Sequence, residues 1–170
     1  MRSVLFVCTA NRFRSPIVEA SFRELLCKQG VEKDWLVGSA GTWTQPGLTV
    51  LPSADWMRTQ LGLELAGHCS RPVSRDLLAS QDLILVMERN QKEALGVDFP
   101  EIRPRLFLLA AFSGGPLFDI LDPFQSQEQT EAACLEVAQA LRKLVLQSFQ
   151  AICLQAELSS SARQAKPGPV

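Results

Sequence analysis

The sequence contains no tyrosine, one histidine and no pair of cysteines spaced Cys-x-x-Cys. Its five cysteines are scattered and odd in number, which argues against a disulfide framework and against a zinc site. No apolar stretch is long enough to span a bilayer or to form a signal peptide, so a cytoplasmic protein is expected. The net charge of -1 indicates neither a nucleic-acid partner nor a membrane partner.

The 170 residues have the composition of a globular protein, with 46% hydrophobic and 21% charged residues. The length fits one domain, which we expect to cover residues 1–155. Residues 156–170 are rich in Ser, Gln, Lys and Pro near the end and predict a disordered tail.

Short apolar runs alternate with segments of helical periodicity along the chain. The runs that predict strands are 3–7, 35–40, 82–87 and 105–109. The segments that predict helices are 16–29, 54–65, 76–80, 90–95 and 128–155. This alternation predicts an α/β fold with a parallel sheet and helices on both of its faces. Ligands of such sheets bind at the carboxyl ends of the strands.

The first predicted strand ends at a cysteine in the segment VLFVCTANRFRSP, residues 4–16. A cysteine is a good nucleophile only as a thiolate. Here the thiolate of Cys8 would be stabilised by the start of the following helix, by the guanidinium of Arg14 and by the hydroxyl of Ser15. The alternative is that Cys8 is a buried, inert cysteine and Arg14 a surface charge.

The loop between the strand and the helix has the features of an anion site. If the loop curls, its backbone N–H groups converge on one point. Arg14 adds a planar fork that matches two phosphate oxygens. The predicted phosphate-binding residues are Thr9, Ala10, Asn11, Arg12, Phe13, Arg14 and Ser15.

Cleavage of a phosphate ester also needs a proton donor for the leaving group. Asp122 precedes Pro123, which restricts its backbone and would fix its carboxyl group on a loop. The alternative is an ordinary Asp-Pro turn, and Asp119 is a competing candidate for the acid.

These segments together resemble the low-molecular-weight protein tyrosine phosphatases over residues 3–150. The resemblance rests on residues 4–16 and on the segments SAGT at 39–42, DLILVM at 82–87 and LDPF at 121–124. It implies a three-layer sandwich around a four-stranded parallel sheet. It also implies hydrolysis of phosphotyrosine in phosphorylated proteins, with no metal or cofactor.

The resemblance implies a role for each site residue. Cys8 would form a phosphocysteine, Arg14 would hold the phosphoryl oxygens, and Asp122 would act as acid and then as base. Residues expected to support the loop are Asn11, Ser15, Ser39 and His68. Residues expected to line the substrate cleft are Arg12, Trp43 and Phe124. A structural role remains the alternative for His68 and Trp43.

Three other functions are compatible with part of this pattern. Arsenate reductases share the fold but need further cysteines, and residues 82–90 contain none. A protein-arginine phosphatase is the main alternative, although the charge of Arg12 should repel a guanidinium group. A non-catalytic phosphate-binding module needs neither a nucleophile nor an acid, so the presence of Cys8, Arg14 and Asp122 together argues against it.

One departure from the family pattern gives a prediction about oxidation. Relatives usually carry a second cysteine at the position of Phe13, which traps the oxidised nucleophile as a disulfide. We therefore expect peroxide to inactivate the protein without forming an internal disulfide at Cys8. Peptide mass mapping after peroxide treatment tests this, and a bridge from Cys8 to Cys27 or Cys69 contradicts it.

Overall fold

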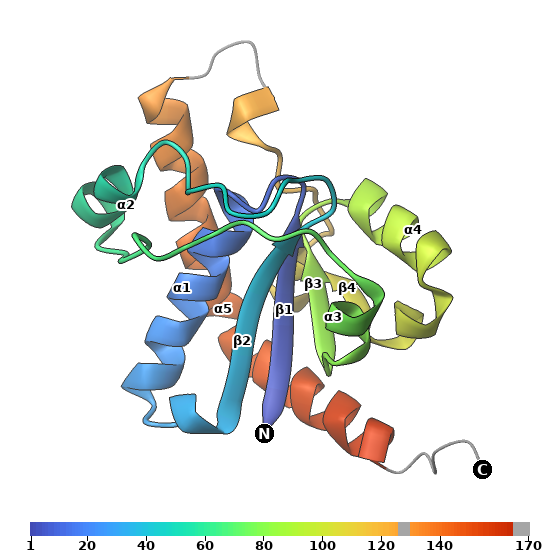
Figure 1. Ribbon diagram of the computed structural model, residues 1–170. Coiled ribbons are helices and arrows are strands. Elements are labelled where there is room, and N and C mark those ends of the chain that lie inside the picture. The colour runs from blue at the N-terminus through green and yellow to red at the C-terminus, as the bar shows by residue number, and fades with distance from the viewer. Residues whose placement is uncertain (126–129, 165–170) are drawn as a thin grey trace.

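A computed structural model describes residues 1–125 and 130–164, and its centre is a parallel sheet (Figure 1). The strands are β1 (Arg2–Cys8), β2 (Trp35–Gly41), β3 (Leu83–Val86) and β4 (Leu106–Leu108). Their order across the sheet is β2-β1-β3-β4, and every neighbouring pair is parallel. The four strands predicted from apolar runs are confirmed.

Helices cover both faces of the sheet, as Figure 1 shows. They are α1 (Arg14–Lys28), α2 (Ala54–Leu61), α3 (Arg75–Ala79), α4 (Arg89–Asp98) and α5 (Glu131–Gln164). Short 3-10 turns lie at Glu32–Asp34, Pro100–Arg105, Leu109–Phe112 and Pro123–Gln125. Helices α1 and α5 pack on one face while α3 and α4 pack on the other, which confirms the three-layer sandwich.

The two cores follow from the alternation of side chains along the central strands. Val4 and Phe6 of β1 belong to the core shared with α1 and α5. Leu5 and Val7 belong to the smaller core beneath α3 and α4. Because both faces are buried, the strand is apolar throughout, which explains why apolar runs located the sheet.

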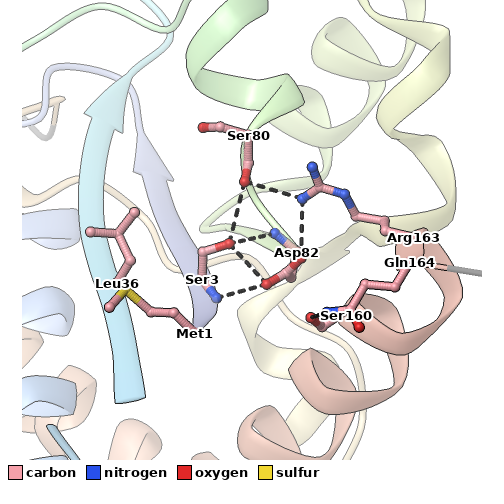
Figure 2. Close-up of a pocket in the computed structure, with 8 residues that line it drawn as sticks. All are labelled: Met1, Ser3, Leu36, Ser80, Asp82, Ser160, Arg163 and Gln164. Carbon is pink, nitrogen blue, oxygen red and sulfur yellow. Dashed lines mark hydrogen bonds and ion pairs between the residues drawn. The ribbon is translucent and has the colours of Figure 1, made fainter. Parts of the chain in front are cut away.

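The end of α5 differs from the sequence prediction. The helix continues to Gln164, so residues 156–164 are helical where a tail was predicted, and residues 165–170 lie outside the described part of the chain. Arg163 holds this end by donating to Asp82 Oδ1 at 3.1 Å and to the carbonyl of Ala79 at 2.9 Å. Asp82 in turn accepts from the backbone N–H of Ser3 at 2.9 Å (Figure 2). These long-range contacts compensate for a polar local sequence.

The strand register brings the chemistry-bearing loops to one edge. Cys8 pairs with Gly41 of β2, and Val7 pairs with Val86 of β3. The loops that follow β1, β2 and β3 therefore leave the sheet side by side, which is the position expected for a ligand site.

None of the helices in the part of the chain that the structure describes combines the length and the hydropathy that a membrane span requires.

Candidate active site

The thiol of Cys8 lies buried at the centre of the loop that joins β1 to α1. Only 2% of the residue is exposed. Its Sγ lies 3.1 Å from Ser15 Oγ and accepts a hydrogen bond from the backbone N–H of Asn11 at 3.3 Å. These contacts and the first turn of α1 surround the sulfur with hydrogen-bonding groups. The sequence predicted the contact with Ser15 but not the one with Asn11.

Asn11 holds the loop in shape. It adopts a left-handed backbone with φ of 55°, which asparagine tolerates better than most residues, and it is fully buried. Its Nδ2 lies 2.9 Å from Ser15 Oγ and 2.9 Å from Ser39 Oγ. His68 Nε2 donates to the Asn11 carbonyl at 2.7 Å. The structure thus brings together the four residues expected to support the loop.

Arg71 also belongs to this network, although the sequence did not predict it. Its backbone N–H donates to Asn11 Oδ1 at 3.0 Å, and its Nε donates to the carbonyl of Ser39 at 2.8 Å. A backbone donor is available at almost every residue, so no side-chain pattern marks it. With Arg71 included, the amide group of Asn11 is engaged through both its oxygen and its nitrogen.

The segment after β2 is tied to the same loop along its length. The N–H groups of Thr42 and Trp43 donate to the carbonyls of Cys8 and Thr9 at 2.9 and 3.0 Å. The fit is close at Gly41, where a Cβ atom would lie 2.6 Å from the carbonyl oxygen of Thr9. These backbone ties fix one rim of the site beside the thiol.

Arg14 is completely buried and is surrounded by acceptors. One terminal nitrogen, Nη1, donates to Glu88 Oε1 and to the carbonyl of Ile120. The other, Nη2, donates to Asp122 Oδ2 at 2.9 Å and to Thr9 Oγ1 at 3.3 Å. Because a buried guanidinium needs compensating charge, the two carboxylates fix where Arg14 points.

Asp122 is the carboxylic acid that the structure places at the site. Its Oδ1 accepts from the backbone N–H of Phe124 at 3.0 Å, and its Oδ2 faces Arg14. Asp119 accepts instead from the backbone N–H of Arg89 at 2.9 Å, at the start of α4. Of the two candidates left open by the sequence, Asp122 alone contacts Arg14 among the described residues.

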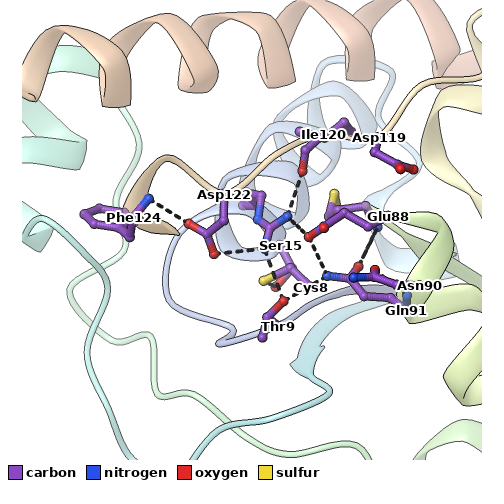
Figure 3. Close-up of polar contacts among 12 residues, drawn as sticks. Cys8, Thr9, Ser15, Glu88, Asn90, Gln91, Asp119, Ile120, Asp122 and Phe124 are labelled. Atoms are coloured by element: carbon purple, nitrogen blue, oxygen red, sulfur yellow. Dashed lines mark hydrogen bonds and ion pairs between the residues drawn. The ribbon is translucent and has the colours of Figure 1, made fainter. Parts of the chain in front are cut away.

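Glu88 and Gln91 are site residues that sequence analysis missed. They form a capping box at the start of α4, a role that usually satisfies only the helix backbone. Here Gln91 Nε2 also donates to Glu88 Oε1 at 3.1 Å and to Thr9 Oγ1 at 3.0 Å (Figure 3). The helix cap therefore links Arg14 to the loop around the thiol.

The three expected cleft residues lie in different surroundings. Trp43 is 83% exposed. Arg12 is partly exposed and donates through Nε to the carbonyl of Thr49 at 2.7 Å. The ring of Phe124 packs edge-on against Phe13, with centroids 5.3 Å apart. Phe13, which occupies the usual position of a second cysteine, is thereby a packing partner of the segment that carries the acid.

Cys134 and Cys153 differ from Cys8 in their surroundings. Burial raises the pKa of Cys153 to about 11, and burial, with a smaller effect of the Asp122 charge, raises the pKa of Cys134. Both side chains therefore stay protonated and weakly nucleophilic near neutral pH. Among residues 1–125 and 130–164, no group of three His, Cys, Asp or Glu side chains could hold a metal ion.

The buried thiol of Cys8, the buried guanidinium of Arg14 and the carboxyl group of Asp122 lie together at the carboxyl edge of a parallel sheet, an arrangement suited to a phosphatase. Residues 3–158 match the family described as low molecular weight phosphotyrosine protein phosphatase. The chain belongs to this family, which confirms the resemblance drawn from its motifs.

Individual relatives differ in the substrates that their names give. The chain is 30% identical over 148 residues to a protein-arginine-phosphatase of Bacillus subtilis, covering 82% of this chain and 97% of that protein. It is 34% identical over 131 residues to the low molecular weight protein-tyrosine-phosphatase Wzb of Escherichia coli K12, covering 77% and 84%. A YwlE arginine phosphatase mutant with a phosphorylated active-site serine superposes with a TM-score of 0.74 at 25% identity, covering 96% and 97%.

The position of Glu88 predicts that it orients Arg14. Replacing it with alanine (Glu88→Ala) removes an acceptor from the buried guanidinium, and we expect kcat/KM on an aryl phosphate to fall by about 100-fold, because small misplacements of a catalytic group are costly. Glu88→Gln keeps an acceptor oxygen and should recover part of the loss. Steady-state kinetics tests this with the exposed Glu136→Gln as control; an alanine variant within twofold of wild type contradicts it.

Proposed function

We propose that the protein hydrolyses phosphotyrosine in proteins through a phosphocysteine intermediate. The observation that carries the proposal is the meeting of three groups, the Cys8 thiol, the Arg14 guanidinium and the Asp122 carboxyl, around one loop. A site that only binds phosphate needs the loop and Arg14 but has no use for a thiolate and an acid. Phosphorylated proteins are the substrate class that the family implies.

In the first step the Cys8 thiolate attacks phosphorus, and the bond from phosphorus to the tyrosine oxygen breaks. Asp122 donates its proton to that leaving oxygen. Arg14 and the N–H groups of the loop hold the phosphoryl oxygens as charge shifts toward the leaving group. The products of this step are a free tyrosine side chain and a phosphorylated Cys8.

In the second step water attacks the phosphocysteine, and Asp122, now a carboxylate, takes a proton from that water. The bond from phosphorus to sulfur breaks, inorganic phosphate leaves, and Cys8 returns to its thiolate form. The phosphorylated active-site serine of the YwlE relative supports a covalent step at this position. The thiolate also requires reducing conditions, so the proposal places the enzyme in the cytoplasm.

Asp122 has to exchange partners during this cycle. Its Oδ2 lies 2.9 Å from Arg14 Nη2. An incoming phosphoryl group offers Arg14 two oxygens in the bidentate geometry that a guanidinium prefers. In this proposal one phosphoryl oxygen takes over Nη2 and a second accepts from Nε, which is buried and has no hydrogen-bond partner in the described residues. The carboxyl group of Asp122 then turns toward the leaving oxygen.

Phosphoarginine is the second candidate substrate, favoured by the 30% identity to the Bacillus subtilis arginine phosphatase. The residue that argues against it is Arg12, whose guanidinium is held at the loop by the Thr49 carbonyl. A fixed positive charge there opposes a second guanidinium and favours substrates with acidic neighbours. Phosphotyrosine is therefore the better match.

The experiment compares kcat/KM on two peptides that differ only in phosphotyrosine or phosphoarginine. We expect kcat/KM to be about tenfold higher, or more, for the phosphotyrosine peptide. The reason is that repulsion between Arg12 and the guanidinium of phosphoarginine is large enough to lower kcat/KM by that factor. Cys8→Ser should abolish turnover of both peptides. A preference for phosphoarginine overturns the choice of substrate. Phosphate binding without turnover of either peptide overturns the proposal that the protein is an enzyme.

A further inference from the structure

A large hollow lies away from the thiol, between α4 and the edge strand β4. Its volume is about 650 Å³, which is in the range of ligand-binding clefts. Its floor is formed by Leu106 and Leu108 of β4. The apolar side chains of Val97 and Leu117 flank it and are 71% and 54% exposed. We call this hollow the α4–β4 groove.

The α4–β4 groove is basic although the whole chain has a net charge of -1. Arg89, Lys92 and Arg103 line it, and Glu93 is the one carboxylate among its lining residues. Arg89 Nη2 donates to the carbonyl of Leu117 at 2.9 Å, and Arg103 Nε donates to the carbonyl of Gly96 at 2.6 Å. The ammonium of Lys92 lies 5.9 Å from the centroid of the Phe107 ring. Since none of the three cations forms an ion pair in the described residues, their charge is available to a ligand.

The spacing of the cations indicates an extended ligand. Arg89 and the Gly96 carbonyl that holds Arg103 are seven positions apart on α4, which is about 10 Å along the helix axis. Three residues of an extended chain span about the same distance. Because side chains on one face of an extended chain recur at every second residue, acidic side chains four residues apart, about 13 Å, can meet both ends of the groove. An aliphatic side chain midway between them, on the same face, then meets Val97. A single small anion would reach only one end.

The groove is also joined to the loop that carries the acid. Leu117 lines the groove, and Asp119 accepts from the N–H of Arg89. In the same loop the carbonyl of Ile120 accepts from Arg14, and Asp122 follows two residues later. A chain seated in the groove therefore touches the segment that positions the acid.

We infer that the α4–β4 groove docks an extended acidic and aliphatic segment of the phosphoprotein substrate. This inference rests on the proposed function, because that function makes a protein chain the substrate. The groove offers cations at both ends and apolar surface between them, and such a pattern matches an extended chain that presents Glu or Asp and aliphatic side chains in turn along one face. Docking there is separate from recognition of the phosphoryl group.

The test measures binding of an unphosphorylated, fluorescein-labelled peptide of Glu-Thr-Val-Thr repeats, in which Glu and Val share one face, by fluorescence anisotropy. The variant Lys92→Glu/Val97→Glu reverses one charge and places another on the apolar wall. Its matched control, Lys143→Glu/Leu146→Glu, makes the same kind of change on exposed positions of α5. We expect wild type and control to bind alike and the groove variant to bind about tenfold more weakly or worse.

The expected binding weakens as salt is added, because exposed charges are screened. Equal affinity in all three proteins overturns the inference, as does equally tight binding of a matched Lys-Thr-Val-Thr peptide. It is also overturned if the peptide does not bind and sedimentation shows a dimer that only the groove variant disrupts, since the occupant is then a second copy of the chain. Turnover of an aryl phosphate, measured alongside, tests the proposed function independently and should be unchanged in both double variants.

Discussion

The buried guanidinium of Arg14 is the constraint on which the arrangement of the site depends. A charge with no exposed surface is tolerated only with charged and hydrogen-bonding partners, because its desolvation is costly. Glu88 comes from the start of α4, Asp122 from the loop before α5, and Thr9 from the loop after β1. Pairing the two terminal nitrogens of one arginine therefore fixes three segments of the chain, while its buried Nε has no hydrogen-bond partner in the described residues.

The same interaction gives the proposed mechanism its order of events. Phosphate and Asp122 compete for one nitrogen of Arg14, while Glu88 holds the other nitrogen in place. In this mechanism Asp122 leaves Arg14 only where a substrate has bound. Glu88 meanwhile keeps the guanidinium of Arg14 in its orientation. Asn11 has the corresponding role for the loop, because its buried side chain ties the loop to Ser15 and Ser39 through hydrogen bonds.

Much of this arrangement could be predicted from the sequence because it is local. The thiol, the loop, Arg14 and Ser15 lie within eight consecutive residues, and an apolar run marks the strand before them. Asp122 could be found because proline follows it. Glu88 could not, since its sequence context is that of a helix cap and its partner Arg14 is 74 positions away. The helical end of α5 was missed for a similar reason, because Arg163 depends on Asp82, 81 positions earlier.

The most direct test of the account is to trap the covalent intermediate. A phosphotyrosine peptide is mixed with enzyme in a rapid-quench apparatus, and the quenched protein is digested and mapped by mass spectrometry. The account predicts one phosphoryl group on the peptide that contains Cys8, formed within a single turnover, and none on Cys134 or Cys153. Release of phosphate from the substrate with Cys8 unmodified at every quench time would contradict it.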